Sequence, residues 1–273
     1  MSARLINLVR LQLAFLRRDW QYETTYRGMM VLQLLGIIGS LIIFFSIGKL
    51  VGGGSESLAP YGGEYFPFAL VGLAVSDYFN TGLRSFSNRL RLAQTTGTLE
   101  AMFTVARSPR LVLIFSGTWD FLVATVRLAL GVGIALVFLG VSFEADILAA
   151  AVIGALSLVT FAALGLFAAA LILIIKRGDA VAALGNIFAT VFAGALFPIS
   201  LLPDWLRWVA YILPLHYSLD GLRRSLLVNE GLSEMGVNLV ALGLSAAILL
   251  PAGIVGLGLA AAFVRRDGSV GMH

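Results

Sequence analysis

The sequence predicts an all-α membrane protein with six transmembrane helices, and three observations support this. Hydrophobic residues make up 59% of the 273 residues, charged residues make up 12%, and the mean hydropathy is +0.94. A soluble domain is about half apolar and a quarter charged, so lipid must solvate much of this chain. Six stretches are apolar over about 20 residues, the length that crosses a bilayer as a helix. No ten-residue alternation typical of a β-barrel is seen.

The six predicted spans form one membrane domain over residues 28–273. Backbone groups in lipid must hydrogen-bond within their own segment, so the spans are helices in a bundle. The second span is the most polar, and the fifth is the shortest. The spans cover residues 29–51, 65–86, 111–139, 147–175, 180–197 and 237–264.

Residues 1–27 predict an amphipathic helix that precedes the first span. Arg10 and Arg17 fall on one face at helical spacing, and Leu16 and Trp20 fall on the other. A basic helix with tryptophan at its edge lies in the headgroup plane. The helix either anchors the topology or also touches a cytoplasmic partner. No signal-peptide cleavage site follows, so we expect the first span to be retained.

The distribution of basic residues predicts the orientation. Fourteen of the nineteen lie in the N-terminal segment, the second and fourth interspan segments and the C-terminus, whereas four lie on the opposite side. Because basic residues remain inside, both termini are expected in the cytoplasm, with the chain in the cytoplasmic (inner) membrane in contact with lipid. In a membrane protein this charge balance indicates topology and lipid contact rather than nucleic acid.

The residue inventory excludes several chemistries. Cysteine is absent and the histidines are His216 and His273, so we expect no disulfide and no metal site. The phosphate-cradling loop Gly-x-x-x-x-Gly-Lys-Ser/Thr is absent, since the only Gly-Lys pair, Gly48-Lys49, is followed by Leu50. We expect the chain to bind no cofactor and to carry no ATPase.

The segment between the second and third spans predicts a short helix. Thr98 can cap it, and Leu99, Met102 and Phe103 share one face before Ser108-Pro109 ends it. Two turns of helix are marginal in water and must dock elsewhere. The surface that receives it is either the membrane or a groove in a soluble partner, and the spacing leaves both open.

The outer segment 198–236 alternates short apolar and polar stretches. Pro198, Pro203 and Pro214 interrupt it, and aromatic residues such as Trp205 suit the membrane interface. An aromatic-belted outer loop is one interpretation. Asp220 and Arg223 are spaced i, i+3, so they can pair on one helix face.

Two runs carry a resemblance to a known family. The run Gln94-Thr-Thr-Gly97-Thr98-Leu99-Glu100-Ala101-Met102, with Ser108-Pro109 after it, resembles the coupling-helix motif of ABC type-2 transporter permeases. The stretches 196–206, 213–217 and 220–223 resemble the signature near the last two spans of the same family. The resemblance covers essentially the whole chain.

The resemblance implies an exporter built from two copies of this chain, a homodimer, with two ATP-binding cassette ATPase subunits that bind ATP and Mg. It implies a cytoplasmic coupling helix and short re-entrant outer helices that cap a central conduit. The coupling contacts would be Gly97, Thr98, Leu99, Glu100, Met102 and Phe103. The outer gate would be Pro198, Pro203, Trp205, Pro214, Asp220 and Arg223. Spans one and five would line the conduit, and the possible lining residues are Asp77, Asn186, Phe188 and Phe192.

Asp77, Asp120 and Arg127 fall inside predicted spans, where each costs about 2.5–3.5 kcal/mol at the bilayer centre. They should face protein or water, either as structural contacts between helices or as part of a substrate route. Asp120 and Arg127 lie two turns apart on one face and could bracket a third partner.

The leading functional interpretation is export of an amphipathic molecule such as a drug, lipid or glycolipid. A polysaccharide or lipid-linked glycan is the alternative cargo, because Phe188 and Phe192 could stack on sugars. An ion-coupled secondary transporter is the alternative from another class. A membrane-embedded enzyme that uses Asp77 and Asp120 is the least supported.

Overall fold

The computed structural model describes residues 2–25, 27–52, 56–95, 109–175 and 190–267, and every regular element in these ranges is helical. The long helices are α1 (Ser2–Thr25), α2 (Arg27–Val51), α3 (Tyr65–Thr95), α5 (Pro109–Phe138), α6 (Ile147–Ile175) and α10 (Gly236–Asp267). The shorter ones are η1 (Glu56–Tyr61), η2 (Ile199–Leu201), α8 (Asp204–Ile212), α9 (Pro214–Leu227) and η3 (Leu232–Glu234).

Four of the described helices are long and apolar enough to cross a membrane. These stretches are Gly28–Val51, Gly117–Phe138, Ile147–Leu171 and Gly236–Leu259. They match four of the six predicted spans. Helix α3 is longer than its predicted span and is not among the four; it carries Asp77 and three arginines. The chain is therefore a multi-pass membrane protein, and the count of six stays a prediction.

Most of the predicted fifth span lies outside the described residues. Its end was predicted at Phe197, but the helical residues stop at Phe192 and a turn follows. Gly194 ends the helix with φ of +81°, a conformation that favours glycine. Sequence hydropathy missed this end because the turn residues are themselves apolar.

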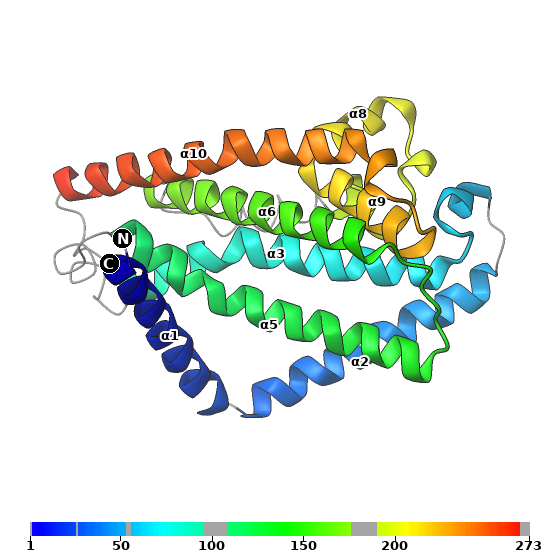
Figure 1. Cartoon of the computed structure of the whole chain (residues 1–273), viewed down its shortest axis with the longest axis horizontal. Coiled ribbons are helices and arrows are strands. Elements are labelled where there is room, and N and C mark those ends of the chain that lie inside the picture. Colours follow the sequence, from blue (N-terminus) through cyan, green and yellow to red (C-terminus); the bar gives the residue numbers. More distant parts are fainter. Residues whose placement is uncertain (1, 26, 53–55, 96–108, 176–189, 268–273) are drawn as a thin grey trace.

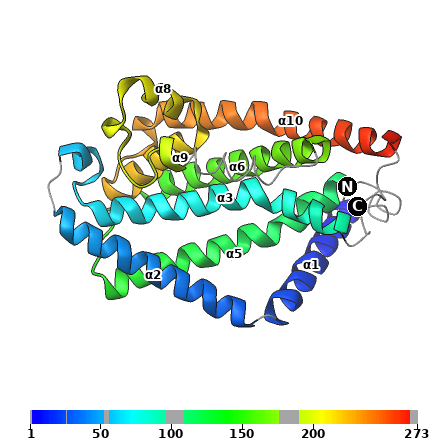
Figure 2. The same ribbon diagram turned by 180° about the vertical axis from the view of Figure 1, so that it is seen from behind.

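Helices α3, α5, α6 and α10 run lengthwise along the molecule, and α1 and α2 are inclined to them (Figure 1). Helix α6 packs against α10 and α3, and α3 also packs against α5. We call the end that carries α8 and α9 the distal end. We call the opposite end, where α3 ends at Thr95 and α5 begins at Pro109, the proximal end. The first residues of α1 and the last turns of α10 share the proximal end, and Figure 2 shows this from behind.

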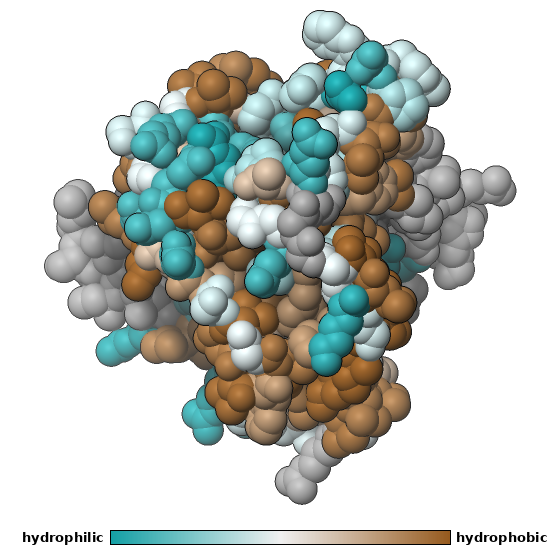
Figure 3. Space-filling view, turned by 90° about the vertical axis from the view of Figure 1, so that its right-hand side faces the viewer, coloured by the Kyte–Doolittle hydropathy of each residue, from teal (hydrophilic) through white to brown (hydrophobic). Residues whose placement is uncertain are grey.

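The core forms where α3 meets its neighbours. Phe79 of α3 packs edge-on against Phe161 of α6 with 5.3 Å between ring centroids. A second cluster joins the distal half of α2 to α3 and α5 through Leu41, Phe66 and Ala135. Large apolar side chains on the outward faces of α2, α5 and α10 remain exposed, as expected of surfaces that lipid solvates. The distal end instead shows hydrophilic and hydrophobic residues interspersed (Figure 3).

Small residues allow α3 and α6 to approach closely. A Cβ atom placed on Gly165 would lie 1.9 Å from the carbonyl oxygen of Gly82. A Cβ on Gly82 would in turn lie 2.7 Å from the carbonyl oxygen of Phe161. Because the obstacles are backbone atoms, any side chain here must push the two helices apart.

We therefore expect Gly165→Ala to lower the free energy of unfolding by about 1–3 kcal/mol, the usual effect of overpacking. Gly133→Ala is the matched control, because a Cβ there meets nothing within 4 Å. Thermal unfolding of the purified variants in detergent measures the difference. Equal unfolding midpoints would contradict the close approach of the two helices.

Candidate functional site

A buried arginine joins three elements at the distal end. Arg223 on α9 is 3% exposed. Its Nε donates to the carbonyl of Phe68 at 3.2 Å, Nη1 to that of Gly194 at 2.8 Å and Nη2 to that of Ala195 at 2.6 Å. The guanidinium carbon also lies 3.4 Å from the centroid of the Phe68 ring. One side chain thus holds α9, α3 and the turn after residue 192 together. We call Arg223 with its three carbonyl partners the distal clamp.

The backbone around Arg223 is shaped for this contact. A Cβ on Gly72 would lie 1.8 Å from the carbonyl oxygen of Ala195, so only glycine lets this turn lie against α3. Burial lowers the pKa of Arg223 from its ordinary value to about 9, and the nearby Tyr61 and Asp220 partly oppose the shift. Near neutral pH the guanidinium therefore keeps the protons that it donates to the three carbonyls.

The predicted Asp220–Arg223 pair does not form. Asp220 instead accepts hydrogen bonds from the Tyr61 hydroxyl at 2.7 Å and from Nδ2 of Asn238 at 3.0 Å. Its nearest cation is Arg224, at 3.8 Å. Spacing of i, i+3 permitted the pair, but the Arg223 side chain turns inward to carbonyls that lie far away in sequence. Asp220 thereby joins η1, α9 and α10.

The other residues predicted for an outer gate lie around this clamp. Pro198 precedes η2, Pro203 precedes α8, and Pro214 is the first residue of α9, as expected for residues that start helices. Trp205 is 73% exposed on α8 and contributes nothing to the buried network. The predicted short helices are thus present, and both their outer location and their role as a gate stay predictions.

A second network lies toward the proximal end. Arg89 on α3 contacts Asp120 of α5 at 2.9 Å and Asp19 of α1 at 3.4 Å. Asp19 is only 4% exposed and also pairs with Arg18 at 2.7 Å. The cluster ties α1 to the two helices that flank residues 96–108. The sequence analysis did not single out Asp19. The signal that could have found it is that Asp19 is the first acidic residue in a helix that otherwise carries basic residues up to that point.

One prediction near this cluster needs correction. Asp120 and Arg127 do not bracket a common third group, because each binds a separate partner on α3. Trp20 is half-exposed and packs edge-on against Trp119 with 6.1 Å between ring centroids, and its position at the membrane edge stays a prediction. Spacing along one helix shows which residues share a face, and it does not show what lies across from them.

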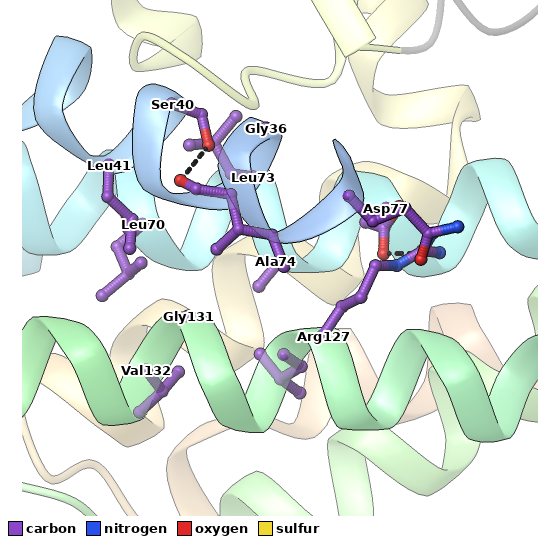
Figure 4. Close-up of a pocket in the computed structure, with 13 residues that line it drawn as sticks. Gly36, Ser40, Leu41, Leu70, Leu73, Ala74, Asp77, Arg127, Gly131 and Val132 are labelled. Atoms are coloured by element: carbon purple, nitrogen blue, oxygen red, sulfur yellow. Dashed lines mark hydrogen bonds and ion pairs between the residues drawn. The ribbon is translucent and has the colours of Figure 1, made fainter. Parts of the chain in front are cut away.

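A third charged pair lies midway along the bundle. Arg127 on α5 contacts Asp77 on α3 at 3.0 Å and donates to Thr81 at 3.4 Å. The pair forms one end of a cavity of about 310 Å³ between α2, α3 and α5 (Figure 4). Asp77 lines this cavity, and its predicted place in a conduit stays a prediction. Phe192 is half-buried and does not line it.

The remaining site predictions fall outside the described residues. These are the conduit residues Asn186 and Phe188, and the six coupling contacts Gly97, Thr98, Leu99, Glu100, Met102 and Phe103. Within the described ranges, no cluster of three or more His, Asp or Glu residues could hold a metal ion. The contacts of Arg223, Arg89 and Arg127 are polar features that the sequence alone did not predict.

A bundle of long apolar helices with paired charges in its interior defines a multi-pass membrane protein. The chain belongs to the ABC-2 type transporter family, whose family model matches residues 11–227. The matched region runs from α1 through α9 and includes residues 96–108. Among curated proteins, no sequence matches the chain. The resemblance noted in the sequence is confirmed.

Loss of the distal clamp should destabilise the protein. We expect Arg223→Met to lower the free energy of unfolding by about 2 kcal/mol or more, because it leaves three carbonyls without their donor. Arg207→Met is the matched control: Arg207 also donates to two carbonyls, but it lies at the surface. Thermal unfolding in detergent compares them, and equal losses would contradict the importance of burial.

Loss of the proximal cluster should have a similar effect. We expect Arg89→Gln to cost about 2 kcal/mol of unfolding free energy, since Asp19 and Asp120 lose their shared cation in a partly buried site. Arg84→Gln removes the same charge from an exposed position on the same helix. If chemical unfolding finds the two variants equally stable, the cluster does not hold α1 to the bundle.

Proposed function

We propose that the chain is the permease subunit of an ATP-driven exporter that moves an amphipathic molecule across the cytoplasmic membrane. The family match over residues 11–227 is the observation that carries this proposal. ATP and Mg would bind a separate ATP-binding cassette subunit, since the sequence has no phosphate-cradling loop. The proximal end would then face the cytoplasm, in agreement with the distribution of basic residues.

The proximal cluster supports a mechanical role for residues 96–108. These residues connect α3 to α5, and the Arg89–Asp120 pair joins the same two helices about two turns before α3 ends and about three turns after α5 begins. Because Asp19 adds α1 to this cluster, a force applied at residues 96–108 would reach three helices together. Such a rigid base suits the transmission of ATPase closure to the membrane bundle.

An amphipathic cargo is favoured over a glycan by the cavity between α2, α3 and α5. Among the described residues, its lining is aliphatic apart from Gln33, Ser40 and the Asp77–Arg127 pair, and none of them is aromatic. Sugar sites commonly rely on aromatic stacking, whereas an aliphatic wall with one charged end suits a molecule with an apolar body and a polar head.

The assembly would contain two copies of this chain and two ATPase subunits. Helix α2 keeps a run of large aliphatic side chains exposed, among them Leu32, Leu35 and Ile42. A second copy would cover part of this surface and lipid the rest. The outer helices η2, α8 and α9 would close the route at the distal end as short re-entrant elements, with the Arg223 clamp as their anchor.

The proposal predicts that residues 96–108 bind the ATPase subunit. An ATPase encoded beside this chain should co-purify with it, and the double variant Glu100→Ala, Phe103→Ala should reduce complex formation by about tenfold or more, as loss of interface anchors does. Asp204→Asn, an exposed change at the distal end, is the control. ATPase activity of the reconstituted complex gives the second measurement.

One result would contradict the proposal. If the chain never associates with an ATPase, yet moves solute along an ion gradient in liposomes, it is a secondary transporter. Normal complex formation by the double variant would instead disprove the role of residues 96–108 as the contact.

A further inference from the structure

The cavity between α2, α3 and α5 has two chemically different ends. Figure 4 shows Leu41, Leu70 and Val132 at one end and the Asp77–Arg127 pair at the other. Its volume of about 310 Å³ falls within the range of small-molecule sites. Gly36 and Gly131 contribute to the space, because neither has a side chain to fill it.

The two ends of the cavity lie along the long axis of the bundle, one toward its distal end and one toward its proximal end. Helix α3 runs from the distal to the proximal end, so Leu70 is distal to Asp77. Helices α2 and α5 run the opposite way, so Leu41 and Val132 also lie on the distal side. From Gln33 to Leu41 is eight residues, or about 12 Å along a helix. The polar end thus faces the proximal side, and the apolar end lies deeper.

The polar end has unused hydrogen-bonding capacity. The Nε of Arg127 is buried and has no hydrogen-bond partner within the part of the chain that the structure describes. The Asp77 side chain remains 41% exposed and that of Arg127 28% exposed. Lipid tails cannot solvate these groups, so an ion pair at this depth needs water or a polar ligand beside it.

The charge pattern specifies the ligand class. An accessible carboxylate and an accessible guanidinium side by side match a head group that carries one cation and one anion. A purely anionic head would meet Asp77, and a purely cationic head would meet Arg127, each with a like-charge penalty. The aliphatic walls fit a hydrocarbon chain and would exclude a fully polar solute.

We propose that this cavity binds a single-chain amphiphile with a zwitterionic head group, whose head contacts Asp77 and Arg127 and whose chain extends toward Leu41. With the head proximal and the chain deeper, the ligand has the orientation of a lipid in the leaflet on the proximal side. The role of the cavity as the place where cargo enters rests on the proposed function, whereas the binding itself requires no ATPase.

Lysophosphatidylcholine is the probe that tests this binding. Titration of the full chain, purified in an alkyl maltoside, should show one saturable site per chain by native mass spectrometry. Gly131→Leu fills the cavity and should weaken binding by about tenfold or more. Gly133→Leu is the matched control, since a Cβ there meets nothing within 4 Å and Gly133 does not line the cavity. Gly36→Leu fills the cavity from the opposite wall and should act like Gly131→Leu.

Head-group selectivity gives a measurement that does not depend on how the filled variants fold. On the unmodified chain, lysophosphatidylcholine should displace both an alkyl phosphate and an alkyltrimethylammonium of equal chain length. Asp77→Asn removes the acid and leaves Arg127, so the preference should change to the alkyl phosphate. A merely structural defect would weaken all three probes alike.

Equal binding of the three probes to the unmodified chain, or equal binding to Gly131→Leu and Gly133→Leu, would overturn the proposal. These results are separable from the ATPase experiment. A chain that binds the probe but no ATPase retains the site and loses the exporter role, and a chain that couples to an ATPase without binding the probe does the reverse.

Discussion

Lipid cannot hydrogen-bond to a charged side chain or to a free backbone carbonyl, and this constraint organises the interior of the bundle. Three arginines show how the constraint is met. Arg223 donates hydrogen bonds to the three backbone carbonyls of Phe68, Gly194 and Ala195. Arg127 and Arg89 each neutralise a carboxylate on the neighbouring helix. In every case the contact joins segments that are far apart in the sequence, so satisfying the charge also fixes the tertiary structure.

Helix α3 is the element on which these contacts converge. It supplies Asp77 and Arg89 to the two ion pairs with α5, and it supplies the Phe68 carbonyl to the distal clamp. This explains why α3 is more polar than α2, α5, α6 and α10 and why it is packed against α5, α6 and α9 instead of facing lipid. A helix with this many charges is stable at membrane depth only when its neighbours pair them.

Hydropathy predicted the long helices because it measures the solvent that each segment needs. The ends of α6 agree with the predicted fourth span, whose loops are polar. Hydropathy gave the wrong end for the fifth span. It placed the end at Phe197, but the helical residues stop at Phe192 and an apolar turn with Gly194 follows. Hydropathy also could not predict which charged side chains pair with one another. Asp120 and Arg127 share a face of α5, but their partners are chosen by how α3 lies against it. Likewise, Arg223 binds carbonyls instead of Asp220, its neighbour in the sequence. One of those carbonyls belongs to Phe68, which lies more than a hundred residues away in the sequence.

The way α2 is attached explains why a cavity exists between it and the bundle. Its distal half is fixed by Leu41, Phe44 and Phe45, which pack with α3 and α5. Its other half diverges from α5 in both ribbon views and exposes Met29 and other large aliphatic residues (Figures 1 and 2).

The cavity lies where α2 begins to diverge, at the boundary between these two halves. Gln33 and Gly36 of the diverging half line the cavity, whereas Leu41 both lines it and belongs to the distal core. The distal half of α2 is therefore the part that the core fixes, and the charged end of the cavity lies toward the half that diverges.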